Sequence, residues 1–326
     1  MQKRLLAHIC VSFLLIFSIN AAPKITYAGE LINPISSKYI PIIVQRESPY
    51  WEAIRAGAEK AAKDYDVNIL IEAPKSPPPT ALNEQLNLFR NALATMPPAV
   101  ILSALDTEAF TPYLEQAQEQ NIPVIALDSN VDSPIIRISV ATDNYKAGEL
   151  AAHRLAELVG GKGKVGILTH RTGITSALNR RSGFVITLVE KYPDIEILPI
   201  QYGIGTTESL IEGAKTLLME NPDIKGIFGT NRDATEVIIN TAKELGKIDS
   251  LKIIGFDASK MISEAIRKGI VSGAIAQDPV NMGYKAVESA IKASAGEDLP
   301  VFINTGFFWY DSSNIDDPRI KVLLYE

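Results

Sequence analysis

Cysteine and histidine are scarce in this sequence. Cys10 is the only cysteine among 326 residues, and three histidines are present. Since a disulfide needs two cysteines, none can form within the chain. His170 follows an apolar segment, but no second histidine or cysteine and no suitably spaced carboxylate accompanies it. We therefore expect neither a disulfide-stabilised fold nor a metal site.

Segments apolar enough to span a bilayer are missing too. The best candidate, residues 11–19 (VSFLLIFSI), falls short of the roughly 20 residues that a span needs. It follows Lys3 and Arg4 and precedes small residues that end in TYA at Ala28. This pattern predicts a secretory signal peptide over residues 1–28, cleaved near Ala28, and thus export to the periplasm. An uncleaved N-terminal anchor is the alternative.

Basic residues are outnumbered by acidic ones. The whole chain has 32 Lys and Arg against 38 Asp and Glu. The predicted signal peptide contains Lys3, Arg4 and Lys24 and no acid, so the mature chain has 29 basic residues against 38 acidic ones, a net charge of −9. Such acidity argues against nucleic acid as a partner. A transcriptional repressor would also need a helix-turn-helix where the signal peptide stands.

The rest of the chain alternates apolar strands with amphipathic helices, and the pattern restarts at residue 144. Apolar strands joined by helices are typical of a parallel sheet covered on both faces. The predicted fold class is therefore α/β, with two doubly wound parallel-sheet lobes. Strands are expected at residues 39–45, 68–72, 99–102, 123–127, 164–168, 196–201, 226–229, 252–256 and 273–276. Helices are expected at residues 53–65, 80–94, 109–120, 144–159, 175–191, 209–220, 235–243, 260–268 and 279–294.

The predicted strands end in polar and aromatic residues. Ligands of open parallel sheets bind beyond the carboxyl ends of the strands. There the chain supplies carboxylates, amides, guanidinium groups, hydroxyls and two aromatic rings, Tyr50 and Trp51. Carboxylates and amides pair with neighbouring hydroxyls of a ligand, Arg donates as a fork, and a ring covers the C–H face of a sugar. These groups predict a site for a neutral polyol.

Fingerprints of catalysis are absent from the sequence. It contains no GxSxG elbow and no GxGxxG dinucleotide motif. GGKGK, residues 160–164, does not have the spacing of a phosphate-binding loop and follows a predicted helix instead of a strand. No nucleophile–base pair is recognisable. We therefore predict that the protein is not an enzyme and needs no cofactor.

Several strand ends carry motifs of a known family. From about residue 38 onward the chain resembles the type I periplasmic sugar-binding proteins, the ribose- and galactose-binding group related to the lac repressor core. SPYW looks like that family's Asn-Pro-Phe-Phe, NIPVIALDS looks like its NIPVITLDR, and ATDNYKAGELAA matches its domain-crossover helix. The other matching motifs are TSALNRRSGF (175–184), IFGTNRDAT (227–235), IIGFDAS (253–259) and AIAQDP (274–279).

The resemblance implies the periplasmic-binding-protein-like I fold, in which three crossovers form a hinge and the ligand lies in a cleft between two lobes. The N-terminal lobe would comprise residues 38–142 plus 278–306, and the C-terminal lobe residues 143–277 plus 307–326. The hinge would lie near residues 142–143, 277–279 and 305–308. Carried over one at a time, the ligand-binding residues are Ser48, Tyr50, Trp51, Asp128, Arg180, Asn231, Asp257 and Gln277.

Three positions depart from the family's pattern. Ser129 stands where the ribose binder has an Arg beside its ligand Asp, Arg232 replaces the Asp after Asn231, and the second-lobe aromatic falls near Gly205. We include Ser129 and Arg232 in the predicted site, although Arg232 could instead pair with an acid across the cleft. If Arg46 also faces the cleft, the ligand should carry negative charge; if it points out, an uncharged sugar is favoured.

The resemblance implies a secreted solute-binding protein that closes around a small polar ligand, first of all a monosaccharide, and delivers it to an ABC importer. A different pentose or hexose, a sugar acid and a furanose-derived autoinducer all stay open. The partners would be this ligand and an ABC permease, or a membrane sensor if the protein reports to a sensor kinase or chemoreceptor instead. We expect a monomer.

Overall fold

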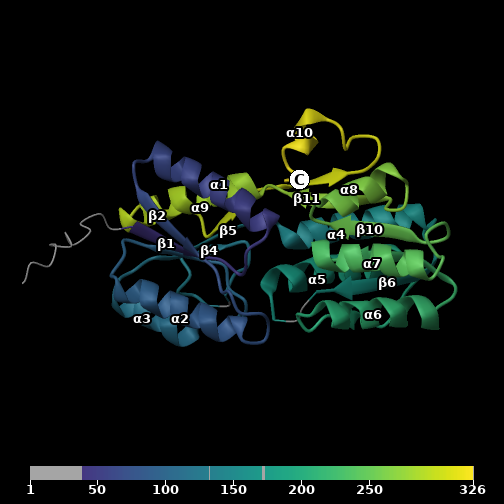
Figure 1. The fold of residues 1–326 in the computed structure, drawn as a ribbon, viewed down its shortest axis with the longest axis horizontal. Helices are drawn as coiled ribbons and strands as arrows, with labels where there is room; N and C mark the ends of the chain where they lie inside the picture. The colour runs from purple at the N-terminus through teal and green to yellow at the C-terminus, as the bar shows by residue number, and fades with distance from the viewer. Residues whose placement is uncertain (1–38, 132, 171–172, 326) are drawn as a thin grey trace, which may run out of the picture. The chain divides into compact units, whose positions relative to one another are not determined.

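Two α/β lobes, each built on its own sheet, make up the described part of the chain (Figure 1). The computed structural model describes residues 39–131, 133–170 and 173–325, so the predicted signal peptide lies outside the described residues. Both lobes belong to one unit of the chain, Ser37–Glu326. The predicted fold class, α/β with two doubly wound sheets, is confirmed.

The first lobe contains a sheet with the strand order β12-β5-β4-β3-β1-β2, in which all neighbouring strands are parallel. Its central strands are buried on both faces, because α1 and α9 pack on one face and α2 and α3 on the other. The strands are β1 (Tyr39–Ile43), β2 (Asn68–Glu72), β3 (Val100–Leu102), β4 (Val124–Leu127), β5 (Ile138–Ala141) and β12 (Phe302–Asn304). The helices are α1 (Pro49–Asp64), α2 (Ala81–Ala94), α3 (Thr111–Glu119) and α9 (Pro279–Ser294).

The second lobe contains a sheet with the order β13-β11-β10-β9-β6-β7, and β8 pairs with β6. Only β13 runs antiparallel to its neighbour among the described strands. Helices α4 and α5 pack on one face, and α6, α7, α8 and the C-terminal segment pack on the other. The strands are β6 (Gly163–Thr169), β7 (Ile195–Ile197), β8 (Gln201–Tyr202), β9 (Ile224–Gly229), β10 (Lys252–Phe256), β11 (Gly273–Gln277) and β13 (Phe307–Tyr310). The helices are α4 (Asn144–Leu158), α5 (Thr175–Lys191), α6 (Thr207–Glu220), α7 (Arg232–Glu244), α8 (Lys260–Arg267) and α10 (Pro318–Lys321).

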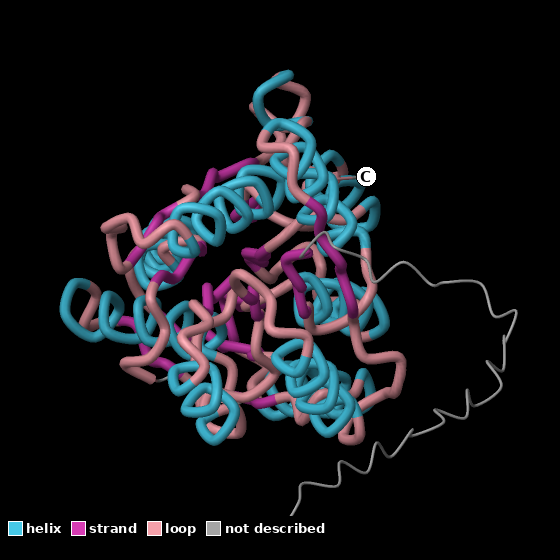
Figure 2. The backbone as a smooth tube through the Cα atoms, turned by 90° about the vertical axis from the view of Figure 1, so that its left-hand side faces the viewer, coloured by secondary structure: helices cyan, strands magenta, loops and turns pink. Residues whose placement is uncertain are grey.

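The chain passes between the two sheets three times: from β5 to α4, from β11 to α9, and from β12 to β13. Figure 2 shows the helices lying outside the strands in a view turned by 90°. Since every strand except β13 runs in parallel with its neighbours, the carboxyl ends of each sheet gather along one edge. The crossovers bring these two edges toward each other, which is where a ligand site is expected.

Two glycines allow α4 and α5 to touch, and this contact places the backbone of Arg180. A Cβ atom on Gly148 of α4 would overlap the carbonyl oxygen of Arg180 on α5, and a Cβ atom on Gly183 would overlap the carbonyl oxygen of Tyr145. Any larger residue would therefore push the two helices apart. In the first lobe, α1 and α9 approach in the same way, with one glycine on each helix.

Some elements differ from the sequence-based expectation. Helix α1 begins at Pro49, four residues earlier than predicted, because proline suits the first turn, where its missing N–H is not needed. Tyr50 and Trp51 therefore lie on the helix itself. The predicted strand at residues 196–201 is divided into β7 and β8, and Pro199 lies between them. Strands β5, β12 and β13 were not predicted; each has only three or four residues.

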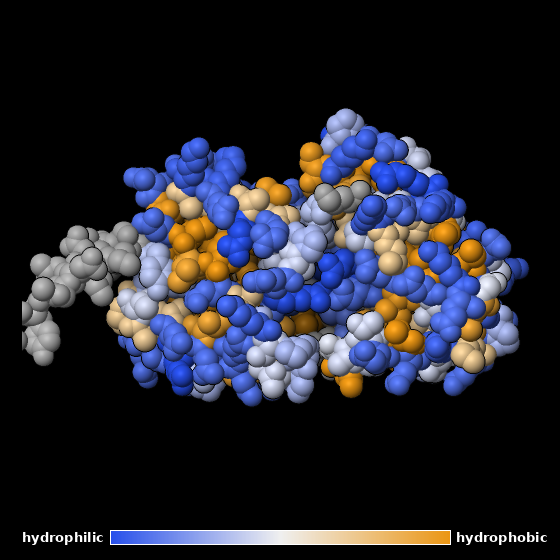
Figure 3. Space-filling model, in the orientation of Figure 1, coloured by the Kyte–Doolittle hydropathy of each residue, from blue (hydrophilic) through white to orange (hydrophobic). Residues whose placement is uncertain are grey.

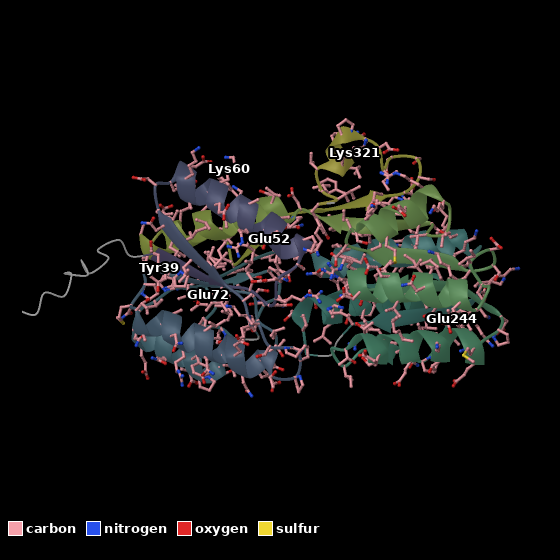
Figure 4. The ribbon with its side chains drawn as sticks, in the orientation of Figure 1. Tyr39, Glu52, Lys60, Glu72, Glu244 and Lys321 are labelled. Carbon is pink, nitrogen blue, oxygen red and sulfur yellow. The ribbon has the colours of Figure 1, made fainter. Side chains whose placement is uncertain are left out.

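The outer faces of the helices are charged. Glu52 and Lys60, labelled in Figure 4, are exposed on α1, whereas Trp51 and Ile54 on the same helix are buried. In the described part of the chain, no helix combines the length and the apolar character that a membrane span requires.

Candidate ligand-binding site

A cavity of about 240 Å³ lies between the carboxyl edges of the two sheets. Seven of the ten predicted site residues line it, and they come from both lobes: Tyr50, Trp51, Asp128, Arg180, Asn231, Asp257 and Gln277. Where the lobes meet on the face shown in Figure 3, the surface is mostly hydrophilic. The structure thus brings together side chains that are up to 227 residues apart in the sequence, from Tyr50 to Gln277.

Asp128 is the central polar group of the first lobe. It follows β4, is 9% exposed and has a left-handed backbone with φ 62°. Its Oδ1 accepts a hydrogen bond from the Tyr50 hydroxyl over 2.6 Å, and its Oδ2 accepts one from the Ser129 hydroxyl over 3.1 Å. Burial raises the pKa of the Asp128 carboxyl, although the Arg180 charge and these hydrogen bonds act the other way.

Tyr50 stays a neutral hydrogen-bond donor. Burial, together with the charges of Asp128 and Asp257, raises the pKa of its hydroxyl well above the ordinary value. Its ring meets Trp51 edge-on at 5.2 Å between centroids, and Tyr325 from the other lobe edge-on at 5.8 Å. Trp51 is 6% exposed and packs into the core of the first lobe while it also lines the cavity. Trp51 therefore supports the cavity wall as a core residue.

Asp257 occupies the same position in the second lobe. It follows β10 and has φ 67°, and its N–H donates to Ile275 of the next strand, as the N–H of Asp128 donates to Val140. A left-handed backbone is uncommon outside glycine, and Asp is one of the few residues that tolerates it. Both lobes thus turn the chain sharply at the strand end and direct a carboxylate to the cavity.

Amide groups hold the carboxylate of Asp257. Its Oδ1 accepts from Gln277 Nε2 over 2.7 Å, and its Oδ2 accepts from the backbone N–H of Arg232 over 3.2 Å. Gln277 in turn accepts from the Thr142 hydroxyl over 2.8 Å. Because Thr142 and Gln277 lie on two of the crossovers, this chain of hydrogen bonds joins the crossovers to the site.

Two tyrosines of the C-terminal segment hold the backbone at Asp257. The Tyr310 hydroxyl donates to the carbonyl oxygen of Asp257 over 2.6 Å, and the Tyr325 hydroxyl accepts from the N–H of Ala258 over 3.0 Å. Both bonds hold the single peptide group that joins Asp257 to Ala258, directly after the left-handed residue. This role was not predictable from the sequence, since neither tyrosine lies in a recognisable motif.

Arg180 is a buried cation, 3% exposed. Its Nε donates to Asn144 over 2.7 Å and its Nη1 to the carbonyl oxygen of Thr230 over 3.0 Å. The guanidinium carbon lies 3.6 Å from the ring centroid of Phe256, a cation–π contact. Asn231 uses its Oδ1 to cap α7 at the N–H of Ala234, which leaves its amide N–H groups for a ligand.

Arg46 and Arg232 are both paired with the same carboxylate. Asp233 accepts from Arg46 over 2.9 Å across the two lobes and from its neighbour Arg232 over 2.8 Å. Burial opposes the ionisation of Asp233, but the charges of both arginines and their hydrogen bonds outweigh it and lower the pKa of this carboxyl. Arg46 therefore forms the ion pair across the cleft, with Asp233 of the second lobe, whereas Arg232 pairs with Asp233 within its own lobe.

Three predicted residues do not line the cavity: Ser48, Ser129 and Arg232. Ser48 precedes α1 with extended backbone and makes no side-chain cap bond. Ser129 is buried, and its hydroxyl lies 3.0 Å from that of Ser176 in the other lobe. Any direct contact of these three side chains with a ligand stays a prediction.

The cavity also has lining residues that are not among the ten predicted site residues. Five of them lie in segments that follow β6 and β8, where the sequence indicated polar strand ends but no individual residue: Ile174, Ser176, Gly205, Thr206 and Thr207. Ser76 and Pro78 come from the proline-rich loop before α2, and Ala81 is the first residue of that helix. The others are Gln45, Arg46, Leu105, His170, Leu210 and Asp233. Among the described residues, no group of three or more His, Cys, Asp or Glu side chains is placed to hold a metal ion.

The comparison with known proteins agrees with this geometry. Residues 42–298 match the model of the periplasmic binding protein domain, and the chain belongs to this family. The chain is 25% identical over 247 residues to the ribose import binding protein of Bacillus subtilis, which covers 74% of this chain and 77% of that protein. It is 24% identical over 253 residues to the D-apiose import binding protein of Actinobacillus succinogenes, covering 77% and 80%.

Solved structures are similar over most of the chain. A carbohydrate transporter solute-binding protein from Agrobacterium radiobacter, in complex with D-arabinose, superposes with a TM-score of 0.82 at 30% identity, covering 89% of this chain and 99% of that one. An ABC transporter solute-binding protein from Agrobacterium vitis with bound D-fucose also gives 0.82, at 29% identity, covering 88% and 100%. The chain is thus a type I periplasmic binding protein and not an enzyme.

Proposed function

We propose that this protein captures a neutral monosaccharide between its two lobes and delivers it to an ABC importer. The observation that carries the proposal is the pair Asp128 and Asp257, which face one cavity from equivalent strand ends of the two sheets. Each carboxylate can accept from two neighbouring hydroxyls, and Arg180 and Asn231 can donate to ring or hydroxyl oxygens. The named sugars of the relatives, ribose, apiose, arabinose and fucose, support this class of ligand.

The charges of the cavity favour an uncharged ligand. Two arginines and three aspartates line it: Arg46, Arg180, Asp128, Asp233 and Asp257. Arg46 does line the cavity, which would by itself favour a negatively charged ligand, but it is already paired with Asp233, so Arg180 faces the two remaining carboxylates. A carboxylate on the ligand would add a further negative charge to this low-dielectric space. We therefore propose a neutral sugar and expect sugar acids to bind weakly.

Contacts between the lobes support capture by closure. Besides the Arg46–Asp233 ion pair and the Ser129–Ser176 contact, the Thr175 hydroxyl donates to the carbonyl oxygen of Asn130 over 2.8 Å. A ligand held by both lobes adds further bonds to this set and so favours the closed form. A membrane permease that recognises the closed form would then receive the loaded protein. We propose that it acts as a monomer in the periplasm after removal of residues 1–28.

Calorimetry on the mature protein tests this proposal. Titration with D-ribose, D-arabinose, D-galactose and D-fucose should give saturable one-to-one binding for at least one sugar, and D-galacturonic acid should bind more weakly than D-galactose. A sugar at 100 times its Kd adds about 2.7 kcal/mol to the free energy of unfolding, so melting curves give an independent reading. If no sugar binds or shifts the melting temperature, the proposal is wrong.

The predicted alternative, a report to a sensor kinase or chemoreceptor, would use the same cavity. Neighbouring genes separate the two outputs, because permease and ATPase genes favour import and a kinase gene favours sensing. Loss of sugar uptake in a strain without this protein would support import directly.

A further inference from the structure

One side of the cavity is lined by aliphatic side chains. Four of these come from separate segments of both lobes and are almost completely buried: Ala81 (6% exposed), Leu105 (7%), Ile174 (4%) and Leu210 (5%). Pro78, which lies shortly before Ala81 in the sequence, also lines the cavity. We call these five residues the aliphatic wall.

Close approaches connect the wall from one lobe to the other. The N–H of Leu105 donates to Gln85 Oε1 over 3.0 Å, and Ala81 lies one turn before Gln85 on α2. The next residue, Asp106, has its Oδ2 3.5 Å from the place of a Cβ on Gly173, which precedes Ile174. The segment of Leu105 in the first lobe therefore approaches the segment of Ile174 in the second, and both side chains line the cavity.

Leu210 extends the wall within the second lobe. A Cβ on Gly203 would lie 2.7 Å from Leu210 Cδ2 and 2.6 Å from the carbonyl oxygen of His170, so Leu210 packs beside the strand end that leads toward Ile174. The neighbouring Thr206 hydroxyl is engaged in capping α6, where it accepts from the N–H of Ser209. Ser76, His170 and Thr207 also line the cavity near the wall in the chain, but the five side chains of the wall themselves offer a ligand no hydrogen-bond partner.

The polar groups of the site lie on the other side, toward the crossovers. Gln277 ends β11 and is bonded to both Thr142 and Asp257, and Tyr50 joins Asp128 to Met282 of α9 through its hydroxyl. Figure 1 shows α2 and α6, which carry Ala81 and Leu210, on the side of the molecule away from β11. A ligand group that contacts the wall therefore meets aliphatic carbon, whereas a group that points toward the crossovers meets the two aspartates and their partners.

This division has a consequence for the ligand. A hydroxyl that faces the wall loses water and finds no partner, which is unfavourable, whereas a methyl or methylene group is favoured there. Resting on the sugar-binding function proposed above, we propose that the preferred ligand is a deoxy sugar whose methyl or methylene carbon contacts the aliphatic wall. Pentoses, which have no exocyclic carbon to place there, should rank second, and hexoses with a free 6-hydroxyl last.

Matched sugar pairs test the proposal by calorimetry. We expect D-fucose to bind at least about tenfold more tightly than D-galactose, or 6-deoxy-D-glucose more tightly than D-glucose by the same factor, since one buried group of this size is worth about that much. If the 6-hydroxyl sugar binds as well as or better than its 6-deoxy partner in both pairs, the inference is overturned while the sugar-binding function stands. If no sugar binds, the proposed function fails and the inference fails with it.

A variant of the aliphatic wall provides a second test of the proposed deoxy-sugar preference. Ile174→Thr places a hydroxyl in the wall at the N-cap position of α5, where Thr is a favoured residue, so the fold should be kept. We expect this variant to lose most of the deoxy preference. Ile204→Thr is the matched control, because Ile204 is 76% exposed and does not line the cavity; its preference ratio should equal that of the unmodified protein. An unchanged ratio in Ile174→Thr, with an unchanged melting temperature, would contradict the proposal.

Discussion

The two lobes present an aspartate at the same point of their sheets, yet they hold it by different groups. Asp128 is bonded by two hydroxyls, those of Tyr50 and Ser129, and burial makes its ionised form unfavourable. Asp257 is bonded by two N–H groups, and two tyrosines fix its backbone. In the first lobe, burial of the ionised Asp128 carboxylate therefore destabilises the protein without ligand, and hydrogen bonds from a ligand can offset this cost. In the second lobe, hydrogen bonds already hold the Asp257 carboxylate in a fixed geometry before a ligand binds.

Removal of the prepared carboxylate should have the largest effect. Asp257→Ala is expected to weaken sugar binding by at least about a hundredfold, because hydrogen bonds to a charged group are worth roughly 1.5–3 kcal/mol each. Calorimetry measures the loss, and circular dichroism checks that the fold persists. Asp249→Asn, an exposed change before β10, is the control and should bind as the unmodified protein does. Unchanged affinity in Asp257→Ala would remove Asp257 from the site.

Asp128→Asn should separate binding from stability. Asn tolerates the left-handed backbone and still accepts from Tyr50, so the change removes mainly the charge. We expect weaker sugar binding but a higher melting temperature, by about 2–4 °C for each kcal/mol recovered. Since the folded-state pKa of Asp128 is raised, its destabilising effect is absent below the unfolded pKa of about 3.9 and complete above the folded pKa. The increase in the melting temperature of Asp128→Asn should therefore be absent below the unfolded pKa and complete above the folded pKa.

Asp233→Asn should lower the melting temperature, whereas Asp128→Asn should raise it. The pKa of Asp233 is lowered in the folded protein, so its ionised form stabilises the fold above the unfolded pKa of about 3.9, and this contribution is lost as the pH falls through the folded pKa. We expect the variant to melt earlier at pH 7, by less than Asp128→Asn gains, because Arg46 is 51% exposed and its ion pair is screened by water. Melting curves at pH 7 and pH 3 measure the difference. An equal loss at both pH values would contradict this reading.

Tyr325→Phe should have the smallest effect. It keeps the ring against Tyr50 but leaves the N–H of Ala258 without its acceptor, at a cost of about 1 kcal/mol. We expect sugar affinity to fall by a few fold, with most of the change in a faster dissociation rate, because the lost hydrogen bond helps to hold the turn that positions Asp257. Stopped-flow fluorescence measures this rate. Tyr113→Phe on α3 is the matched control, and a similar loss of affinity or gain in dissociation rate there would show that the effect is not specific to the turn at Asp257.

Much of the architecture follows from local pattern. The long apolar runs and amphipathic helices were predictable because their periodicity is strong, and Asp128 and Asp257 could be found because ligand sites follow strand ends. The short strands β5, β12 and β13 were not predicted, since three or four residues carry little periodic signal. The aliphatic wall was missed for a related reason: isolated residues such as Leu105 and Ile174 look like ordinary core positions.

Sequence alone therefore determined the α/β class, the strand ends that face the site and the two aspartates, because these depend on contacts and patterns local in the chain. Only the tertiary structure decided the partners across the cleft. Arg46 pairs with an acid 187 residues away, and Ser129 meets Ser176 in the other lobe. Such pairs depend on how two independently folded sheets approach each other, which no local pattern specifies. Whether Arg46 is available to a ligand is settled by its partner, Asp233, and not by its place beside Tyr50 and Trp51 in the sequence.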